Sequence, residues 1–248
     1  MAPRVVTAAQ VIVDTFDVSG WVGTIGDAPG SFELKERRTF GDRGFMRRMP
    51  GVRDGSWKLD GYADHEELVG VSALLTPADL GLSKAVSIAL PSSGYDVAAG
   101  DWCQFGSGRL SSISTAGSSV GELAPFGVEL QSTGAFVLSG KVGAPLASRT
   151  TSGLTGTAVA LTGPGSGQSL YALLQVTEAA GTNLVVKVQS DDNSGFTSAT
   201  DRITFATTSA ISTQLLSVAG DLSTETYWRV TATIASVTFS FACYFGIV

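Results

Sequence analysis

Histidine and cysteine are scarce in this sequence, and so are charged residues. The 248 residues include one histidine and two cysteines, and only 15% of them are charged. Histidine is the commonest general base and metal ligand, so most nucleophilic triads and metal centres lack their usual component. The two cysteines, Cys103 and Cys243, lie too far apart to suggest a disulfide framework. We interpret both as reduced core residues.

Long apolar runs are missing as well. Val11, Ile12 and Val13 form one of the short runs present, and no continuous apolar stretch follows basic residues near the N-terminus. The sequence therefore predicts neither a signal peptide nor a membrane span. We expect the protein to be made and kept in the cytoplasm. The formal net charge is −6, which gives no electrostatic reason to bind nucleic acid or an anionic membrane.

Small and hydroxyl-bearing residues are abundant instead, which is typical of short strands joined by tight turns. The clearest period-two alternation lies near the C-terminus, so one face of that strand is expected to be buried. Two further segments alternate in the same way, at 227–234 and 184–189. The apolar positions of the last strand are Val237, Phe239, Phe241, Cys243, Phe245 and Ile247.

A Ser/Thr/Gly stretch at 149–156 separates two regions of different composition. All basic residues except Lys187, Arg202 and Arg229 precede it or, in the case of Arg149, begin it. We therefore predict an all-β chain with two domains: a tail-tube-type β-barrel or sandwich at 1–150 and an antiparallel β-sandwich at 151–248. The first domain should contain strands at 84–90, 102–113, 119–130 and 135–142, and one short helix at 66–75 that Pro77 ends.

Three ordered motifs precede residue 63. Asp17-Val18-Ser19-Gly20-Trp21 is followed by Thr39-Phe40-Gly41-Asp42 and then by residues 50–62, PGVRDGSWKLDGY. This order resembles the major tail tube proteins of long-tailed bacteriophages (siphophages), closely over 11–62 and only in pattern to about residue 142. In that family the first motif is a turn after the opening strand. The other two flank a long hairpin whose returning strand enters the tube sheet.

The resemblance implies a structural virion protein without enzymatic activity, cofactor or metal. It implies hexameric rings of identical copies, stacked into a hollow tube in the phage tail, through which DNA passes during ejection. The expected partners are other copies of the chain, the tape measure and the tail terminator, with no membrane involved. Residues after 156 lie outside the minimal family pattern, so they are expected to form an outer decorating domain. They also leave open a role in the capsid or tail tip.

A basic segment at 35–58 holds eight of the sixteen Lys and Arg residues against three carboxylates. Phenylalanine and methionine are interleaved with these charges, and Arg, Met and aromatic residues are enriched in interface cores. We predict an inter-ring contact here, the alternative being a solvated loop. The predicted interface residues are Lys35, Arg37, Arg38, Phe40, Arg43, Phe45, Met46, Arg47, Arg48, Met49 and Arg53.

Catalytic readings depend on isolated motifs. Ser119 lies in a G-x-S-x-G pattern at 117–121, but a nucleophile elbow also needs a strand–turn–helix context and a downstream histidine. His65 with Glu66 and Glu67 lacks a second histidine to complete a metal site, and an acidic helix start explains these residues as well. The glycine-rich stretch at 163–167 has no following Lys-Ser/Thr pair, so it is interpreted as a loop and not as a phosphate cradle.

The C-terminal region offers one binding alternative. Asp191, Asp192 and Asn193 could provide oxygen ligands to Ca²⁺, although a polar hairpin loop is the simpler interpretation. The same loop, with Tyr227 and Trp228 nearby, could recognise a glycan or a host surface, which would make the chain a surface binding module of a capsid or tail.

Overall fold

The computed structural model describes residues 8–26, 31–37, 47–63, 77–114, 124–235 and 238–248. Within these ranges the chain is β throughout, apart from one turn of 3₁₀ helix, η2 (Pro77–Asp79), and every strand pairing is antiparallel. The predicted all-β class is confirmed. Among the described residues no helix has the length and hydropathy needed to cross a membrane. The helix predicted at 66–75 lies outside the described residues.

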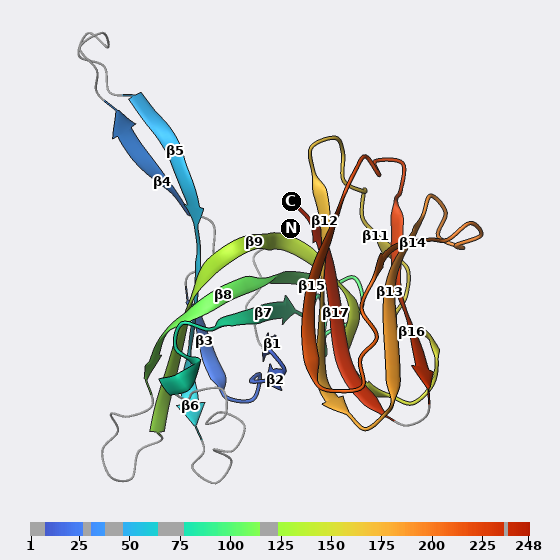
Figure 1. The fold of residues 1–248 in the computed structure, drawn as a ribbon, viewed down its shortest axis with the longest axis horizontal. Helices are drawn as coiled ribbons and strands as arrows, with labels where there is room; N and C mark the ends of the chain where they lie inside the picture. Colours follow the sequence, from blue (N-terminus) through green and yellow to red (C-terminus); the bar gives the residue numbers. More distant parts are fainter. Residues whose placement is uncertain (1–7, 27–30, 38–46, 64–76, 115–123, 236–237) are drawn as a thin grey trace.

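A ten-stranded sheet runs through most of the molecule (Figure 1). Its main path is β15-β12-β17-β9-β8-β7-β1-β2, and β6 joins it by pairing with both β3 and β9. The strands are β1 (Gln10–Val13), β2 (Phe16–Asp17), β3 (Val22–Gly26), β6 (Ser56–Ala63), β7 (Ser83–Leu90), β8 (Trp102–Ser114), β9 (Ala124–Arg149), β12 (Ser169–Ala179), β15 (Ser212–Ala219) and β17 (Phe239–Ile247).

Two smaller sheets complete the fold. A five-stranded sheet, in the order β10-β16-β13-β14 with β11 beside β16, covers one face of the C-terminal half. A separate hairpin pairs β4 with β5 and extends away from the rest of the molecule (Figure 1). The strands are β4 (Ser31–Arg37), β5 (Arg47–Asp54), β10 (Gly153–Leu154), β11 (Val159–Ala160), β13 (Asn183–Asp191), β14 (Thr200–Thr204) and β16 (Tyr227–Ala235).

Strand β9 connects the two halves of the large sheet. It pairs with β6 over its first part, with β17 over its last part, and with β8 between 127 and 141. The sequence predicted two strands here, ending and restarting around Gly134, and this prediction is wrong. Glycine and serine residues lie where the register between β8 and β9 shifts, so they serve β-bulges that bend a continuous strand and do not form a turn. The predicted strands at 84–90 and 102–113 correspond to β7 and β8.

Three apolar clusters lie on the faces of this sheet. One fills the N-terminal half, with residues from β1, β6, β7, β8 and β9, and contains Trp57 and Phe136. Another fills the C-terminal sandwich, where β12, β17 and β9 pack against the five-stranded sheet. The predicted alternation in β13 and β16 is confirmed, because Val186 and Val230 point into this sandwich while their neighbours remain partly exposed.

The third cluster joins the two halves. Ile12 and Phe105 from the first half pack with Leu173 and Tyr244 from the second half. β17 is therefore buried on both faces, because its even-numbered residues meet this cluster while its odd-numbered residues meet the sandwich. The sequence predicted only one buried face for the last strand, since the polar or small residues that alternate there looked like a solvent-facing row.

A buried polar network crosses the same junction. Gln175 on β12 accepts a hydrogen bond from the Ser87 hydroxyl of β7 at 2.5 Å. Its amide nitrogen donates to the Ile12 carbonyl at 3.4 Å and to the Asp14 carbonyl at 2.8 Å. Because β12 and β1 lie far apart in the strand order, these bonds mean that the sheet rolls until its two ends approach each other.

The predicted domain boundary falls between β9, which ends at Arg149, and β10, which begins at Gly153 in the other sheet. Arg149 fixes this turn: its guanidinium donates to the Pro145 carbonyl at 2.7 Å and the Phe241 carbonyl at 2.8 Å. The large sheet itself continues across the boundary through the β9–β17 pairing. The division into 1–150 and 151–248 stays a prediction.

Both cysteines are free and buried, as the sequence predicted. They flank the same strand, with Cys103 opposite Gly140 and Cys243 opposite Ala144 on the two sides of β9. Their side chains belong to different clusters on opposite faces of the sheet, so they are not placed to bridge. Burial raises the pKa of both thiols, which keeps them protonated and unreactive.

Candidate assembly surface

The β4–β5 hairpin is the feature that extends furthest from the body of the molecule (Figure 1). Its returning strand continues almost directly into the large sheet, because only Gly55 separates β5 from β6. The Gly55 carbonyl accepts a hydrogen bond from the Ser132 backbone at 2.7 Å, which ties this junction to β9. A long hairpin whose returning strand enters the sheet is the arrangement that the tail tube resemblance implied.

The register of the hairpin places cations on both of its faces. Arg37 lies opposite Arg47, and Lys35 lies opposite Met49. Opposed residues in an antiparallel pair share a face, and so do residues two apart, so these three cations occupy register positions on one face. On the other face, Glu36 lies opposite Arg48 and Phe32 lies opposite Arg53.

The charge distribution of the whole chain is asymmetric. Residues 35–58 carry eight cations and three carboxylates, a net charge of +5, whereas the rest of the chain carries eight cations and nineteen carboxylates, a net charge of −11. The hairpin is thus electrostatically complementary to the remainder of any second copy. Of the predicted interface residues, Lys35, Arg37, Arg47, Arg48, Met49 and Arg53 lie in β4 or β5. The others, Arg38, Phe40, Arg43, Phe45 and Met46, lie outside the described residues, and the contact itself stays a prediction.

The base of the hairpin is firmly packed. Trp57, two residues after Gly55, is 1% exposed and meets Phe136 edge to face, with ring centroids 6.2 Å apart. Two glycines of β8 make room for this indole: a Cβ on Gly106 or Gly108 would lie 3.1 Å from its ring. The hairpin therefore extends from a part of the sheet that has little freedom to repack.

The exposed face of β6, β9 and β8 is polar and balanced in charge. Lys58 lies 3.7 Å from Asp60, and the Gln131 amide donates to Glu129 at 2.7 Å. Arg109, opposite Gln131, is the second cation of this face. Hydroxyl groups fill much of the remaining surface, from Ser107, Ser111, Ser112 and Thr133. With two cations and two carboxylates, this face has no net charge.

An open, mainly apolar cavity of about 710 Å³ lies between β1, β3, β7 and β8. Val11, Ile25 and Trp102 are typical of its lining, and its polar groups come from Ser19, Thr24 and Gln104. The described lining residues include no acid, base or thiol. The Ser19 hydroxyl accepts a hydrogen bond from the Val11 backbone at 2.9 Å and donates to Asp17, so it secures the turn after β1. This is the turn that the first sequence motif predicted.

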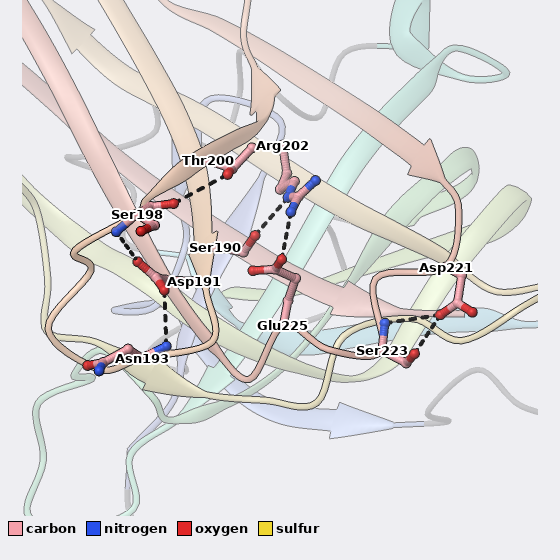
Figure 2. Close-up of polar contacts among 9 residues, drawn as sticks. All are labelled: Ser190, Asp191, Asn193, Ser198, Thr200, Arg202, Asp221, Ser223 and Glu225. Atoms are coloured by element: carbon pink, nitrogen blue, oxygen red, sulfur yellow. Dashed lines mark hydrogen bonds and ion pairs between the residues drawn. The ribbon is translucent and has the colours of Figure 1, made fainter.

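The Asp191 loop of the C-terminal half is a self-contained polar turn (Figure 2). The Asp191 carboxylate accepts hydrogen bonds from the backbone of Asn193 at 3.1 Å and of Ser198 at 2.8 Å. The hydrogen bond from Ser198 is the largest cause that lowers the pKa of Asp191, and a hydrogen bond with Asp191 in turn raises the pKa of Asp192. Both carboxylate oxygens of Asp191 are thus engaged in shaping the loop.

An ion pair closes the same end of the sandwich (Figure 2). Arg202 donates to Ser190 at 2.8 Å and to Glu225 at 2.7 Å. Nearby, Asp221 accepts hydrogen bonds from the backbone and hydroxyl of Ser223. Across the described part of the chain, no three His, Cys, Asp or Glu side chains are grouped as metal ligands. These contacts fit the polar hairpin loop and lend no support to the Ca²⁺ alternative.

The two aromatic residues proposed for surface recognition differ in position. Trp228 is fully buried, and its indole nitrogen donates to the Leu161 carbonyl at 2.7 Å. Its assignment to a recognition surface is therefore wrong, because the period-two alternation of β16 directs it into the sandwich. Tyr227 is half-buried at the start of β16, opposite Asp191. The motifs around His65 and Ser119 lie outside the described residues.

One surface element escaped the sequence prediction. β15 forms an end of the ten-stranded sheet, pairing with β12 over eight residues. Its sequence, STQLLSVA, lacks the strict alternation that revealed β13 and β16, because polar and apolar residues occur on both faces. The signal available in the sequence was a run of nine residues from Ile211 to Ala219 without charge, proline or glycine.

No family model matches the sequence, and no curated protein matches it significantly. Solved structures with some likeness are components of phage tails and injection machines. The sheath/tube terminator of an extracellular contractile injection system is 14% identical, with a TM-score of 0.41, over 55% of this chain and 96% of that one. The cap that terminates the tube of the anti-feeding prophage is 15% identical, with a TM-score of 0.41, over 56% of this chain and 93% of that one. The Dit protein of phage SPP1, described as a hub of the adsorption apparatus, is 10% identical, with a TM-score of 0.39, over 98% of this chain and the whole of that one.

Proposed function

We propose that this chain is a non-enzymatic structural protein of a phage tail, which assembles with copies of itself into stacked rings. The tail tube resemblance implies that each ring is a hexamer. The observation that carries the proposal is the projecting, basic β4–β5 hairpin on an otherwise acidic chain. The hairpin extends away from the rest of its own copy. The basic segment 35–58, which contains most of the hairpin, has a net charge of +5 and is complementary in charge to the remainder of the next copy.

The direction of the contact follows from the fold. A hairpin that projects from one surface and docks on a different surface of the next copy makes a head-to-tail contact, which produces rings or filaments and not closed dimers. In this proposal the cations of the hairpin meet carboxylates of the neighbouring copy, while Phe45 and Met46, which lie between β4 and β5 in the sequence, provide its apolar anchors. Buried anchors carry most of the binding energy of an interface, and exposed charges mainly set orientation and association rate.

The lumen of the tube is the second part of the proposal. DNA passes through a channel only if its wall does not hold phosphates, so the wall should be neutral or acidic. The face of β6, β9 and β8 meets this condition, since Lys58 is close to Asp60 and its remaining surface is rich in hydroxyl and amide groups. β6, which forms part of this face, directly follows the returning strand β5 of the hairpin. The ring contact and the channel wall would therefore be adjacent in the sequence.

The proposed location is the virion tail, with assembly in the host cytoplasm. The proposed partners are further copies of the chain, the tape measure within the tube and the tail terminator at its end. Residues 151–248 would form the outer part of each subunit.

Negative-stain electron microscopy of the purified full-length protein tests the ring and the tube directly. Phe45→Ala should shorten tubes at every salt concentration, because it removes an apolar anchor. The double charge reversal Arg47→Glu with Arg48→Glu should shorten them most at low salt, because ions screen exposed charges over about 10 Å at 0.1 M. The matched control reverses two cations outside the hairpin, Lys187→Glu with Arg229→Glu, and should leave tubes unchanged.

The hairpin variants should keep the melting temperature of the unassembled wild type, because the proposed contact lies between copies and not within one. Tubes of normal length from a protein that combines Phe45→Ala with both hairpin reversals would refute the proposed contact. A wild type that forms neither rings nor tubes at any salt concentration would refute the proposed function.

A further inference from the structure

Strand β15 is an unprotected edge of the ten-stranded sheet. It pairs with β12 from Ser212 to Ala219, and its backbone makes no other hydrogen bond to the described residues. None of its eight residues is charged, and none is proline or glycine. A strand of this kind presents a row of free N–H and C=O groups, which is the usual template for pairing with another chain.

Other edges of the described sheets have features that discourage such pairing. β14, the end of the five-stranded sheet, is five residues long and contains two charged residues held in ion pairs: Asp201 with Lys187 and Arg202 with Glu225, each at 2.7 Å. β2 has only two residues, and β3 contains two glycines and a register shift. Short length, charge and irregularity are the known protections of edge strands. β15 has none of them.

The same edge exposes apolar side chains. Leu216 is 37% exposed in the middle of β15, and Ile211, immediately before the strand, is 53% exposed. Gln214 brings no unsatisfied polar group, because its amide already exchanges hydrogen bonds with the Ala206 backbone at 2.8 and 2.9 Å. An edge that combines free backbone groups with exposed leucine and isoleucine gains from being covered.

We propose that β15 pairs with β15 of a second copy, antiparallel and in register about Leu216. A two-fold axis through this position places Leu216 opposite its own equivalent and Gln214 opposite Val218 of the second copy. Like charges that face each other normally oppose the pairing of identical strands, and β15 has no charge to do so. This contact is isologous and uses a different surface from the hairpin, so it does not depend on the proposed ring.

A single engineered cysteine tests the register. Opposed Cα atoms in an antiparallel pair lie about 4.5–5.5 Å apart, within the range that a disulfide spans. Leu216→Cys should therefore give a covalent dimer of twice the 25.5 kDa chain mass under mild oxidation. The two native cysteines are completely buried and should contribute no background. The matched control is Thr204→Cys on the exposed edge of β14, which should stay monomeric on a non-reducing gel.

A second variant measures the non-covalent contact. Leu216→Lys places two cations opposite each other, so it should abolish the dimer that sedimentation velocity detects. The variant with both hairpin reversals, Arg47→Glu and Arg48→Glu, should still form this dimer. The pairing would be overturned if the hairpin-reversal variant, with Leu216 unchanged, were monomeric. It would also be overturned if the oxidised Leu216→Cys protein gave no more dimer than the Thr204→Cys control. If the protein with native hairpin residues formed neither rings nor tubes but Leu216→Cys still gave the cross-link, only the proposed function would be refuted.

Discussion

Gln175 is the polar side chain at the centre of the junction between the two halves of the molecule. It is completely buried, as is its partner Ser87, and it makes three hydrogen bonds to β1, β7 and the turn after β1. Gln175→Met keeps the volume of the side chain and removes all three. Each bond contributes about 1 kcal/mol net, and a buried partner left unpaired costs about 1–3 kcal/mol. The Ile12 bond is long and Asp14 is partly exposed, so we expect a total loss of roughly 2–4 kcal/mol.

The assay is urea denaturation of the full-length protein, followed by tryptophan fluorescence and circular dichroism. The matched control is Gln189→Met, whose amide bonds Asp201 and Arg229 on the outer face of the five-stranded sheet, and which should cost under about 1 kcal/mol. Adding Ser87→Ala to Gln175→Met should cost less than the sum of the two single changes, since they share one bond. Equal losses for Gln175→Met and Gln189→Met would refute the role assigned to the junction.

Three further predictions test the rest of the fold. The fragment 156–248 lacks β9, so it should unfold at a lower urea concentration than the fragment 135–248, which keeps the part of β9 that pairs with β17. If the two midpoints were equal, or if the shorter fragment were equally soluble and unfolded cooperatively, residues after the boundary at 150 would form an independent domain. Phe241→Ala should cost about 3–5 kcal/mol because the ring is completely buried in the sandwich, whereas Thr238→Ala, before the strand, should cost under about 1 kcal/mol by the same titration. Asp191→Ala should destabilise the protein at neutral pH. The pKa of Asp191 is lowered in the folded state, so the stability that this carboxylate contributes is present above its unfolded pKa and is lost as the pH falls through its folded pKa. The difference in melting temperature between wild type and variant should therefore shrink in acid, and a constant difference down to low pH would contradict this.

Much of the local structure follows from the sequence. The alternation of Leu184, Val186 and Val188 predicts a strand with one buried face, and β13 has this pattern because its outer face stays open to solvent. The turn at Asp17 and Ser19 was equally predictable, since short polar side chains bond the nearby backbone without help from distant residues. The concentration of cations between 35 and 58 is also a property of the sequence alone. These features depend on neighbours within a few residues.

Other features were decided by contacts between distant strands. Period-two alternation reveals a strand only when one face is wet, so it could not show that Tyr244 and Ala242 of β17 meet a second cluster. The aromatic Trp228 looked available for recognition until the five-stranded sheet closed over it. The glycine and serine residues of β9 suggested a turn in the sequence, but the shifts in register between β8 and β9 make them part of bulges in one long strand.

The edge of the sheet shows the division most clearly. The sequence by itself determined that 211–219 is uncharged and free of proline, which permits a strand but does not say where it lies. Its position at the end of the large sheet depends on the pairing of β12 with β17 and of β17 with β9, over a sequence separation of up to about a hundred residues. Sequence patterns report which face of a strand is apolar. Only the tertiary structure determines which strands lack a neighbour, because strand order is set by the packing of all three clusters together.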